Sequence, residues 1–422
     1  MHDIRLFRDQ PDAIRRALRR RGEDGMVVDE IRALDEARRT VLTELEALKA
    51  TRNTESKRIG ALKDAVERDA AIQAMRAANT RIDALEAQLA EVDAALQAKM
   101  NGVPNMPAER VPDGRNADDN VVVRTIGDVG DPARDVQPHW DIGPALGLID
   151  FERGVRMSGS RFYVLKGAGA RLQRALIQWM LDFHTSRGYV EIMPPYIVRE
   201  ACMWHAGQLP KFRDNLYHDA EEDFWLVPTA EVPLTNLHVD EILTADDLPL
   251  HYVAYTPCFR REKMSAGSDV RGIKRGHQFD KVEMYKFTTP ETSAAALDAM
   301  LADGEATLAA LGLPYRVLQL CAGDLGFGST VTYDLEVWAP GCGEWLEVSS
   351  ISDFGGFQAR RANIRYRAEP GAAAVPVHTL NGSGLGIPRT MIAILEHHQR
   401  PDGTISVPEV LRDRVGADVI GG

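Results

Sequence analysis

Two long helical patterns near the N-terminus constrain the fold of this chain more than any other feature. From Ile31 to Leu62, apolar residues recur mostly at steps of three and four, and a second such series runs from Ile72 to Leu96 without Pro or Gly. This heptad spacing places the apolar side chains along one face of each helix. A polar stretch, residues 64–69, separates the two series, so we expect the helices to fold back on each other as an antiparallel hairpin.

The predicted hairpin is long enough to form an arm. Each helix of roughly 30 residues extends roughly 45 Å, which exceeds the helices of most compact domains. Between positions 31 and 100 there are 12 basic and 12 acidic residues, a balance that fits a plain dimerisation or spacer coiled coil. One basic cluster in the hairpin fits either a solvated helix face or a surface for nucleic-acid phosphates. Its members are Arg52, Lys57, Arg58 and Lys63.

The length and the linker chemistry predict two domains. At 422 residues the chain is too long for one ordinary core. Between Asn101 and Asp141 the helical pattern gives way to Pro, Gly and Asp, which are typical of turns and linkers. We therefore predict an N-terminal domain of residues 1–103 and a second domain of residues 104–422.

The second region predicts an α+β domain. A helical pattern covers residues 170–186, and short β-rich runs follow it without a regular alternation of strands and helices. This arrangement favours an antiparallel β-sheet flanked by helices. The β-rich runs are residues 224–227, 282–287, 332–338 and 345–348. There is no G-x-x-x-x-G-K-[ST] loop and no strand-linked G-x-G-x-x-G, so any ATP site must be built in another way.

Composition excludes several classes of protein. The chain is 44% hydrophobic and 27% charged, which is typical of globular proteins, and its net charge of -12 disfavours a protein that coats DNA. No apolar run is long enough for a membrane span, and the N-terminus lacks the apolar core of a secretory signal. The four cysteines show no C-x-x-C spacing. We therefore expect reduced thiols in a cytoplasmic protein, with neither a disulfide framework nor a zinc site.

Two segments are rich in residues that carry chemistry. The first, from Thr256 to Phe287, places Arg, Lys, Gly and Ser between two apolar runs and predicts a hairpin with a charged, mobile loop. Within it, Arg260 and Glu262 either meet an anion such as phosphate or form a simple ion pair. The second segment places a Gly-rich turn before an apolar helix that has Arg389 near its start. Its glycines allow either a ligand or a neighbouring element to approach the backbone closely.

These segments resemble the signature motifs of the class II aminoacyl-tRNA synthetases, and in particular of the seryl branch. The residues from Phe259 to Phe279 resemble motif 2, those from Gly382 to Arg389 resemble motif 3, and those from Gly188 to Pro195 resemble the weaker motif 1 at the dimer interface. The resemblance covers essentially the whole chain. Segments similar to the seryl branch are Thr229-Ala230-Glu231, residues 357–361, residues 378–384 and the two-helix arm with residues 56–60.

The resemblance implies a two-step reaction that uses ATP and Mg²⁺. L-Serine attacks ATP to give seryl-adenylate and pyrophosphate, and the seryl group then passes to the 3' end of tRNA(Ser), with tRNA(Sec) as a further acceptor to consider. Arg260 and Arg389 are the implied catalytic residues, the first at the α-phosphate and the second at the adenine face or the γ-phosphate. Glu347 and Ser350 are the implied magnesium ligands.

The same resemblance implies the remaining site residues. Glu262 accepts the adenine amino group, Phe279 stacks on the ring, and Gly276 leaves room beside the nucleotide. The whole implied ATP-binding set is Arg260, Arg261, Glu262, Gly276, Phe279, Glu347, Val348, Ser349, Ser350 and Arg389. The implied serine-binding set is Thr229, Ala230, Glu231, Glu283 and Ser383, and the residues leave open which carboxylate takes the ammonium group and which the hydroxyl.

The resemblance also gives the arm a role. The family's hairpin reaches across a homodimer to grip tRNA, which implies that Arg52, Lys57, Arg58 and Lys63 form part of a tRNA-binding surface. The departures from the family pattern are modest. Lys263-Met264 stands where many relatives carry Ala-Gly, and Ile387-Pro388 where they carry Val-Gly. Neither departure removes an implied ligand.

Two alternatives remain at this stage. One is a seryl-adenylate-forming paralogue that loads a carrier protein, which is expected to lack the long arm. The other is a non-catalytic regulatory relative that binds RNA, in which the loss of a residue such as Arg260, Glu262, Glu283 or Arg389 is expected. This chain keeps the arm and all four residues.

Overall fold

The computed structural model describes residues 1–130, 136–263 and 271–421. They divide into two compact units, Met1–Pro104 and Asn105–Gly422. Among the described residues, no helix is both long and apolar enough to cross a membrane.

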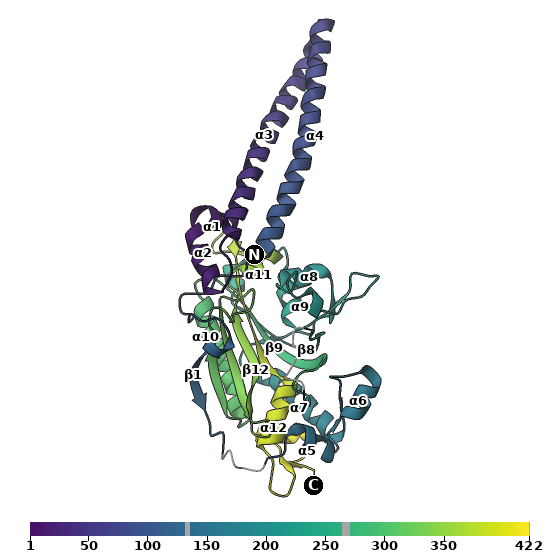
Figure 1. Ribbon diagram of the computed structural model, residues 1–422, viewed down its shortest axis with the longest axis vertical. Coiled ribbons are helices and arrows are strands. Elements are labelled where there is room, and N and C mark those ends of the chain that lie inside the picture. The colour runs from purple at the N-terminus through teal and green to yellow at the C-terminus, as the bar shows by residue number, and fades with distance from the viewer. Residues whose placement is uncertain (131–135, 264–270, 422) are drawn as a thin grey trace. The chain divides into compact units, whose positions relative to one another are not determined.

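The N-terminal unit is dominated by the predicted hairpin. Two short helices, α1 (Ile4–Asp9) and α2 (Pro11–Arg20), precede α3 (Val27–Ala61) and α4 (Ala65–Asn101), which lie side by side (Figure 1). Their 35 and 37 residues correspond to about 50 to 55 Å of helix. The polar stretch expected to separate the helices is instead the first turn of α4, because the Asp64 side chain accepts hydrogen bonds from the N–H groups of Val66 and Glu67 and so caps the helix.

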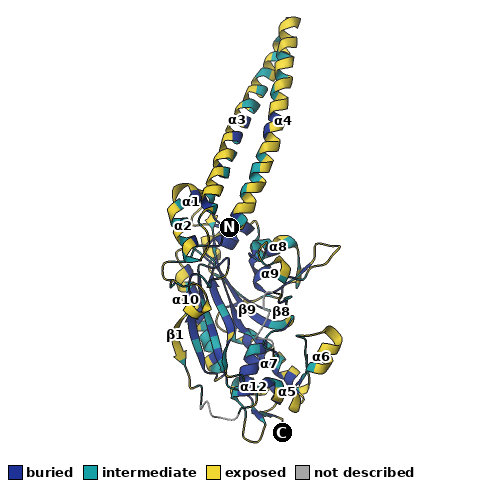
Figure 2. Cartoon of the chain, in the orientation of Figure 1, coloured by how far each residue is buried: buried dark blue, intermediate teal, exposed yellow. Residues whose placement is uncertain are grey.

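A narrow apolar seam pairs α3 with α4. Figure 2 shows a thin buried stripe between two helices that are otherwise mostly exposed. Ion pairs flank this seam, with Arg38 Nε 2.6 Å from Asp93 and Lys49 Nζ 2.6 Å from Glu86. The pairing of the hairpin therefore rests on few buried side chains and on the register that the ion pairs favour. The buried members of the seam are Val41, Leu45, Ile82 and Leu85.

The second unit is built on an eight-stranded sheet, and neighbouring strands are antiparallel except for the parallel pair β4 and β8. This confirms the predicted α+β fold. In spatial order the strands are β1 (Val121–Ile126), β10 (Tyr315–Gln319), β11 (Val331–Ala339), β12 (Glu344–Asp353), β15 (His378–Gly386), β9 (Gln278–Thr288), β8 (Leu250–Phe259) and β4 (Val190–Glu191).

One strand contradicts the sequence interpretation. Residues 121–126 were expected to belong to a linker, but they form β1 at the sheet edge, paired with β10. Nearly all of its side chains are exposed, so the strand lacks the alternation of buried and exposed positions that marks a strand in sequence. Backbone hydrogen bonds to β10, rather than side-chain burial, hold it in place.

Three helices cover one face of the sheet. The helices α7 (Gly167–Thr185), α10 (Ser293–Ala310) and α12 (Ile387–His397) share one apolar core with the strands. Because successive side chains on a strand point to opposite faces, β9 sends Val282 and Met284 into this core and Lys281 and Glu283 to the other face. The other face is partly covered where residues 230–234 and 359–362 pack on Tyr285 and Phe287, and beside them it is left for a binding site.

Shorter elements surround the sheet. The predicted helix at residues 170–186 is α7, whereas the predicted strand at residues 224–227 shrinks to the two residues of β6. The short helices are α5 (His139–Ala145), α6 (Phe151–Ser158), α8 (Glu200–His205), α9 (Glu231–Thr235), α11 (Phe357–Ala362) and α13 (Arg412–Val415). The short strands are β2 (Ile149–Asp150), β3 (Val164–Leu165), β5 (Ile197–Val198), β6 (Trp225–Leu226), β7 (Ile242–Thr244), β13 (Arg365–Arg367), β14 (Val375–Pro376), β16 (Ile405–Ser406) and β17 (Val419–Ile420).

Candidate active site

A cavity of about 480 Å³ lies on the open face of the sheet in the second unit. Its volume is within the range of about 300 to 1,000 Å³ that is usual for small-molecule sites. Residues of β9, β12, β15 and the start of α12 line it, so segments far apart in the sequence meet there. The lining includes Thr229, Glu231, Arg260, Glu262, Gly276, Phe279, Glu283, Glu347, Val348, Ser350, Ser383 and Arg389.

Arg260 lies at the end of the predicted hairpin. Strands β8 and β9 pair from Leu250 opposite Phe287 to Phe259 opposite Gln278, and Arg260 follows directly. Its Nε donates to the Pro228 carbonyl at 3.2 Å, and its guanidinium lies 5.0 Å from the centroid of the Phe279 ring. These contacts hold a planar cation at the wall of the cavity, where it can grip a phosphate.

Glu262 is a buried carboxylate in an unusual backbone conformation. Its φ is +50°, in the left-handed region, and its backbone carbonyl accepts from Arg161 at 3.1 Å. Its side chain accepts from Arg275 Nη1 at 2.9 Å. The charge of Glu262 is thus balanced by Arg275, which lies on the opposite arm of the hairpin.

Arg389 projects from the first turn of α12 toward the same cavity. Its Nη1 donates to the Glu347 carbonyl at 2.7 Å and lies 3.7 Å from the Glu347 carboxylate. Its Nε donates to the Lys274 carbonyl at 3.2 Å. Arg389 therefore links β12 to the segment that returns from the motif 2 loop.

An all-oxygen donor set lies on β11 and β12. Glu347 and Ser350 line the cavity, and Asp334 on β11 lies directly opposite Ser350. Burial, and then the charge of Glu347, raise the pKa of Asp334 well above its ordinary value. Two carboxylates with a hydroxyl beside them are suited to a hard cation such as Mg²⁺.

The amino-acid end of the cavity contains a lysine that the sequence interpretation did not name. Lys281 Nζ donates to Thr229 Oγ1 at 2.8 Å and forms an ion pair with Glu283. All three side chains are almost completely buried. The sequence signal that could have identified Lys281 is the alternation of side chains along β9. This alternation puts residues 279, 281 and 283 on one face of the sheet.

Glu231, at the start of α9, is the second carboxylate of this end. Burial, and then the charge of Glu283, raise its pKa to about 7. Gln358 Nε2 donates to Glu231 Oε1 at 2.6 Å, and Gln358 Oε1 accepts from Thr379 Oγ1 at 2.6 Å. This network fixes the carboxylate in position for a ligand that brings its own positive charge.

The glycines of motif 3 serve packing. Residues 382–386 were expected to form a turn, but they belong to β15, a central strand. A Cβ at Gly382 would lie 2.6 Å from Ile351, and one at Gly384 would lie 2.9 Å from His184. The tight-contact alternative therefore accounts for these two positions.

Three implied residues do not line the cavity. Ala230 is fully buried in a separate apolar cluster, and Ser349 donates its hydroxyl hydrogen bond to the Ser383 carbonyl at 2.6 Å. Arg261 contacts Asn215 through its backbone N–H at 2.9 Å. Met264 and the rest of the predicted charged loop, residues 264–270, lie outside the described residues.

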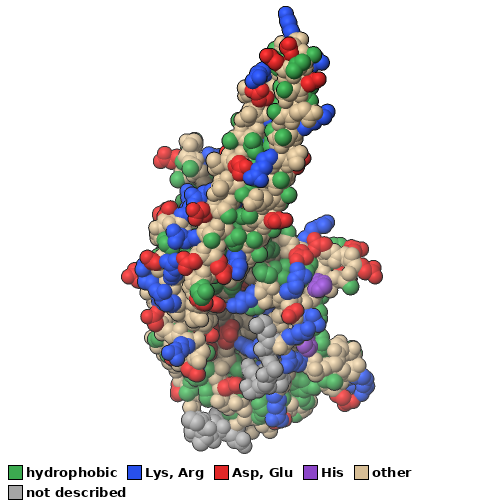
Figure 3. All heavy atoms as spheres, turned by 45° about the horizontal axis from the view of Figure 1, so that its top comes forward, with side chains coloured by type: hydrophobic (Ala, Val, Ile, Leu, Met, Phe, Trp, Pro, Cys, Tyr) green, Lys and Arg blue, Asp and Glu red, His purple; other side chains and the backbone are tan. Residues whose placement is uncertain are grey.

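The four implied tRNA-binding residues lie in the N-terminal unit near the turn between α3 and α4. Lys57, Arg58 and Lys63 are exposed, and Arg52 is half-buried. Arg58 lies 3.3 Å from Glu55 on the same helix, and Figure 3 shows basic and acidic side chains mixed over the hairpin. Their side chains are thus accessible, or partly accessible in the case of Arg52.

Family models match both units. Residues 1–107 match the seryl-tRNA synthetase N-terminal domain, and residues 212–398 match the tRNA synthetase class II core domain (G, H, P, S and T). A serine–tRNA ligase of Chloroflexus aurantiacus is 59% identical over 99% of this chain and 98% of the relative. One of Roseiflexus castenholzii is 61% identical over 100% of this chain and 99% of the relative.

A solved structure shows the same fold over the whole chain. It is the seryl-tRNA synthetase of Pyrococcus horikoshii complexed with ATP, with a TM-score of 0.93 and 36% identity. The match covers 100% of this chain and 99% of that one.

Proposed function

The chain belongs to the seryl-tRNA synthetase family, and from this premise we propose that it activates L-serine with ATP and transfers the seryl group to tRNA(Ser). One observation of the site carries the proposal. A single cavity has two arginines, Arg260 and Arg389, at one end and two buried carboxylates, Glu231 and Glu283, at the other. The first pair suits the phosphates of ATP, and the second suits the ammonium and hydroxyl groups of serine.

In the first step, a serine carboxylate oxygen forms a bond to the α-phosphorus of ATP, and the bond to pyrophosphate breaks. No proton has to move, so the protein's main task is to neutralise and orient charge. Arg260 stabilises the charge that develops on the α-phosphate, and Arg389 holds the nucleotide from the other wall. In the second step, the terminal ribose hydroxyl of tRNA attacks the seryl carbonyl, and AMP leaves.

Serine selection follows from the buried polar groups of the site. The cavity presents buried hydroxyl and carboxylate groups to the amino acid, and these belong to Thr229, Glu231, Glu283 and Ser383. Alanine leaves the groups that bind the serine hydroxyl without partners, and such sites discriminate by about 10⁴ or more. Threonine is instead excluded by the room that its methyl group needs.

Magnesium is the proposed metal cofactor. Glu347 and Ser350 would hold it, because they line the cavity wall and Asp334 lies opposite Ser350, so oxygen donors of the kind that Mg²⁺ prefers lie close together. When bound, the ion neutralises phosphate charge and helps to orient the nucleotide.

We assign tRNA binding to the predicted N-terminal domain, residues 1–103, and the chemistry to the predicted domain of residues 104–422. The exposed cations near the hairpin turn supply phosphate contacts to tRNA. A homodimer is part of this proposal. Its support is that β4, within motif 1, lies at an edge of the sheet, where Val190 in the strand is 57% exposed and Met193 just after it is 83% exposed. The proposed location of this activity is the cytoplasm.

Serine-dependent exchange of labelled pyrophosphate into ATP, run beside alanine and threonine, tests the first step. Charging of tRNA(Ser) then tests the second. Exchange with serine followed by charging supports the proposal. Exchange without charging favours the loading of a carrier protein, and the absence of exchange in a folded protein that binds RNA favours a regulatory relative.

A further inference from the structure

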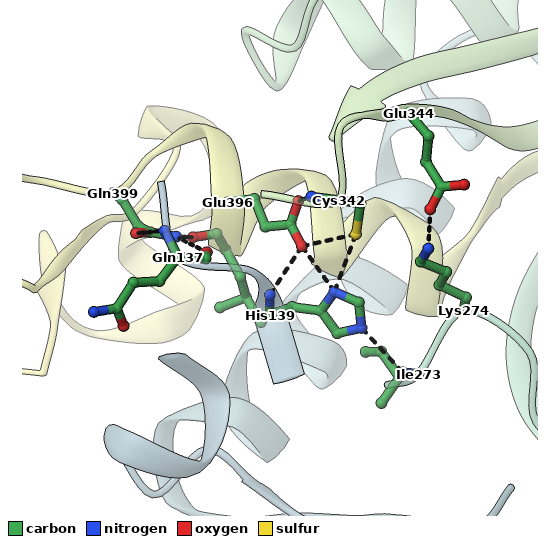
Figure 4. Close-up of polar contacts among 9 residues, drawn as sticks. Gln137, His139, Ile273, Lys274, Cys342, Glu344, Glu396 and Gln399 are labelled. Atoms are coloured by element: carbon green, nitrogen blue, oxygen red, sulfur yellow. Dashed lines mark hydrogen bonds and ion pairs between the residues drawn. The ribbon is translucent and has the colours of Figure 1, made fainter. Parts of the chain in front are cut away.

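A buried cluster outside the cavity joins three separate parts of the second unit. It consists of His139 at the start of α5, Cys342 in the turn between β11 and β12, and Glu396 near the end of α12 (Figure 4). His139 Nδ1 lies 2.8 Å from Glu396 Oε1, and the Cys342 thiol donates to the same oxygen at 3.1 Å. Neither His139 nor Glu396 has any exposed side-chain surface.

The hydrogen bonds fix where the imidazole proton lies. The backbone N–H of Ile273 points at His139 Nε2 at 3.1 Å, and because an N–H can only donate, Nε2 must be the unprotonated nitrogen. The proton is therefore on Nδ1, where it is donated to Glu396. Glu396 also accepts the backbone N–H groups of His139 at 2.8 Å and of Cys342 at 3.0 Å.

The same geometry argues against a metal ion in this cluster, although its three side chains are common ligands. A metal on Nδ1 would displace the proton to Nε2, where it would face the Ile273 N–H. Burial by itself raises the pKa of Glu396, but the hydrogen bonds from His139 and Cys342 outweigh burial and hold that pKa below its ordinary value. The charged carboxylate is thus satisfied by donors of the protein.

His139 holds the segment that returns from the motif 2 loop, residues 271–276. Gly272 has a φ of +74°, and a Cβ there would lie 1.9 Å from His139 Nε2, so the backbone rests directly on the imidazole. The next residue of α5 extends the contact, since the Trp140 ring centroid lies 4.4 Å from Arg271 Cζ and 5.4 Å from Lys274 Nζ. Lys274 also forms an ion pair with Glu344 (Figure 4).

The held segment carries the groups that face the nucleotide end of the cavity. The carbonyl of Lys274 positions Arg389, the side chain of Arg275 balances Glu262, and Gly276 lines the wall. A shift of Ile273 therefore moves three ATP-facing positions together, whereas the serine end, built on β9, β15 and the start of α9, lies outside this segment.

We infer that His139 is a positioning residue for ATP, which acts by holding the backbone of Ile273 from a neutral imidazole oriented by Glu396. The inference rests on the proposed function, because it concerns the nucleotide end of that site. It requires that loss of the Nε2 acceptor weakens ATP binding and leaves serine binding intact.

The test compares His139→Ala with His139→Gln in the full-length protein. Gln places an amide oxygen near the position of Nε2 and so keeps an acceptor for Ile273, whereas Ala keeps none. In serine-dependent pyrophosphate exchange, we expect the KM for ATP to rise about tenfold in H139A, the scale of one buried hydrogen bond, while the KM for serine changes less than about twofold. H139Q should recover most of the ATP effect. Calorimetric titration with a non-hydrolysable ATP analogue should show the same order of affinities.

His2→Ala is the matched control, because it removes a buried contact from His2 Nε2 to the Pro104 carbonyl at 2.8 Å in the N-terminal unit. It should leave both KM values unchanged. If H139A does not fold, Gly272→Ala tests the same contact from the loop side and should raise the KM for ATP.

Several results would overturn the inference. They are an unchanged KM for ATP in folded H139A, an equal rise of both KM values with a lower melting temperature, and no recovery in H139Q. Stoichiometric zinc in the purified protein, measured by elemental analysis, would also overturn it, because the metal would replace the Nδ1 proton. Absence of exchange in the unmodified protein would instead count against the proposed function, so the two failures are distinguishable.

Discussion

The two units of this chain are stabilised in different ways. In the N-terminal unit, α3 and α4 are joined by a narrow seam and by ion pairs between partly exposed side chains, and most of their surface faces solvent. In the second unit, strands distant in sequence lie side by side, with β9 between β8 and β15, and buried charged groups depend on one another. Changes in the hairpin should therefore act locally, whereas changes at the cavity should affect chemistry and stability together.

The largest contrast is expected at Arg260. Replacing it with Ala removes a cation aimed at the α-phosphate and should lower kcat/KM for pyrophosphate exchange by about 10² to 10³. Arg76→Ala, which removes an exposed cation from α4, should leave exchange unchanged. Steady-state kinetics of the two variants measure this difference, and similar losses in both would remove the distinction between the units.

The hairpin should respond to a change in its seam. Leu85 is 1% exposed, and Leu85→Ala should destabilise the N-terminal unit by about 3 kcal/mol, through lost burial and a cavity. Val66→Ala, at a position 79% exposed, should change stability by less than about 0.5 kcal/mol. Urea unfolding measures both values. Pyrophosphate exchange in folded L85A should match that of the unmodified protein, and a reduced kcat would show that the units are coupled.

The second unit should show a pH dependence that comes from Glu231. Its folded-state pKa of about 7 is above the ordinary value of 4.5. At pH values below 4.5 the group is protonated in both states, and as the pH rises toward 7 the unfolded state loses the proton while the folded state keeps it. Stability should therefore fall across this window, by up to about 3 kcal/mol, and level off above it.

Glu231→Gln should remove this part of the pH dependence. Urea unfolding of both proteins at a series of pH values measures it. The variant should lose less stability than the unmodified protein as the pH rises through the window, and parallel curves would contradict the assignment of the shift to Glu231.

The smallest effect is expected from the charges of the hairpin. Neutralising four basic residues of the hairpin together should raise the KM for tRNA(Ser) about tenfold and reduce its salt dependence, because phosphate contacts are lost. These residues are Arg52, Lys57, Arg58 and Lys63. Pyrophosphate exchange without tRNA should not change. An unaffected KM for tRNA would remove these residues from the proposed surface.

The sequence best predicted the features that depend on residues close together in the chain. The heptad spacing gave the hairpin, because each helix needs only its own periodicity to form an apolar face. Most of the site residues that the sequence motifs implied line one cavity. Strand β1 was missed because its exposed side chains leave no burial pattern, and the motif 3 segment was taken for a turn because its glycines resemble one.

Patterns local to the chain therefore specify the paired helices, the antiparallel α+β class and the family whose motifs the chain carries. Which side chains meet depends on the folded arrangement of the strands and helices. Three examples involve residues from separate elements. Lys281 donates a hydrogen bond to Thr229, and the charge of Glu283 helps to raise the pKa of Glu231. The backbone N–H of Ile273 donates a hydrogen bond to His139. The physical reason is that hydrogen bonding and desolvation depend on distances and burial in the folded chain, and local sequence patterns do not encode these quantities.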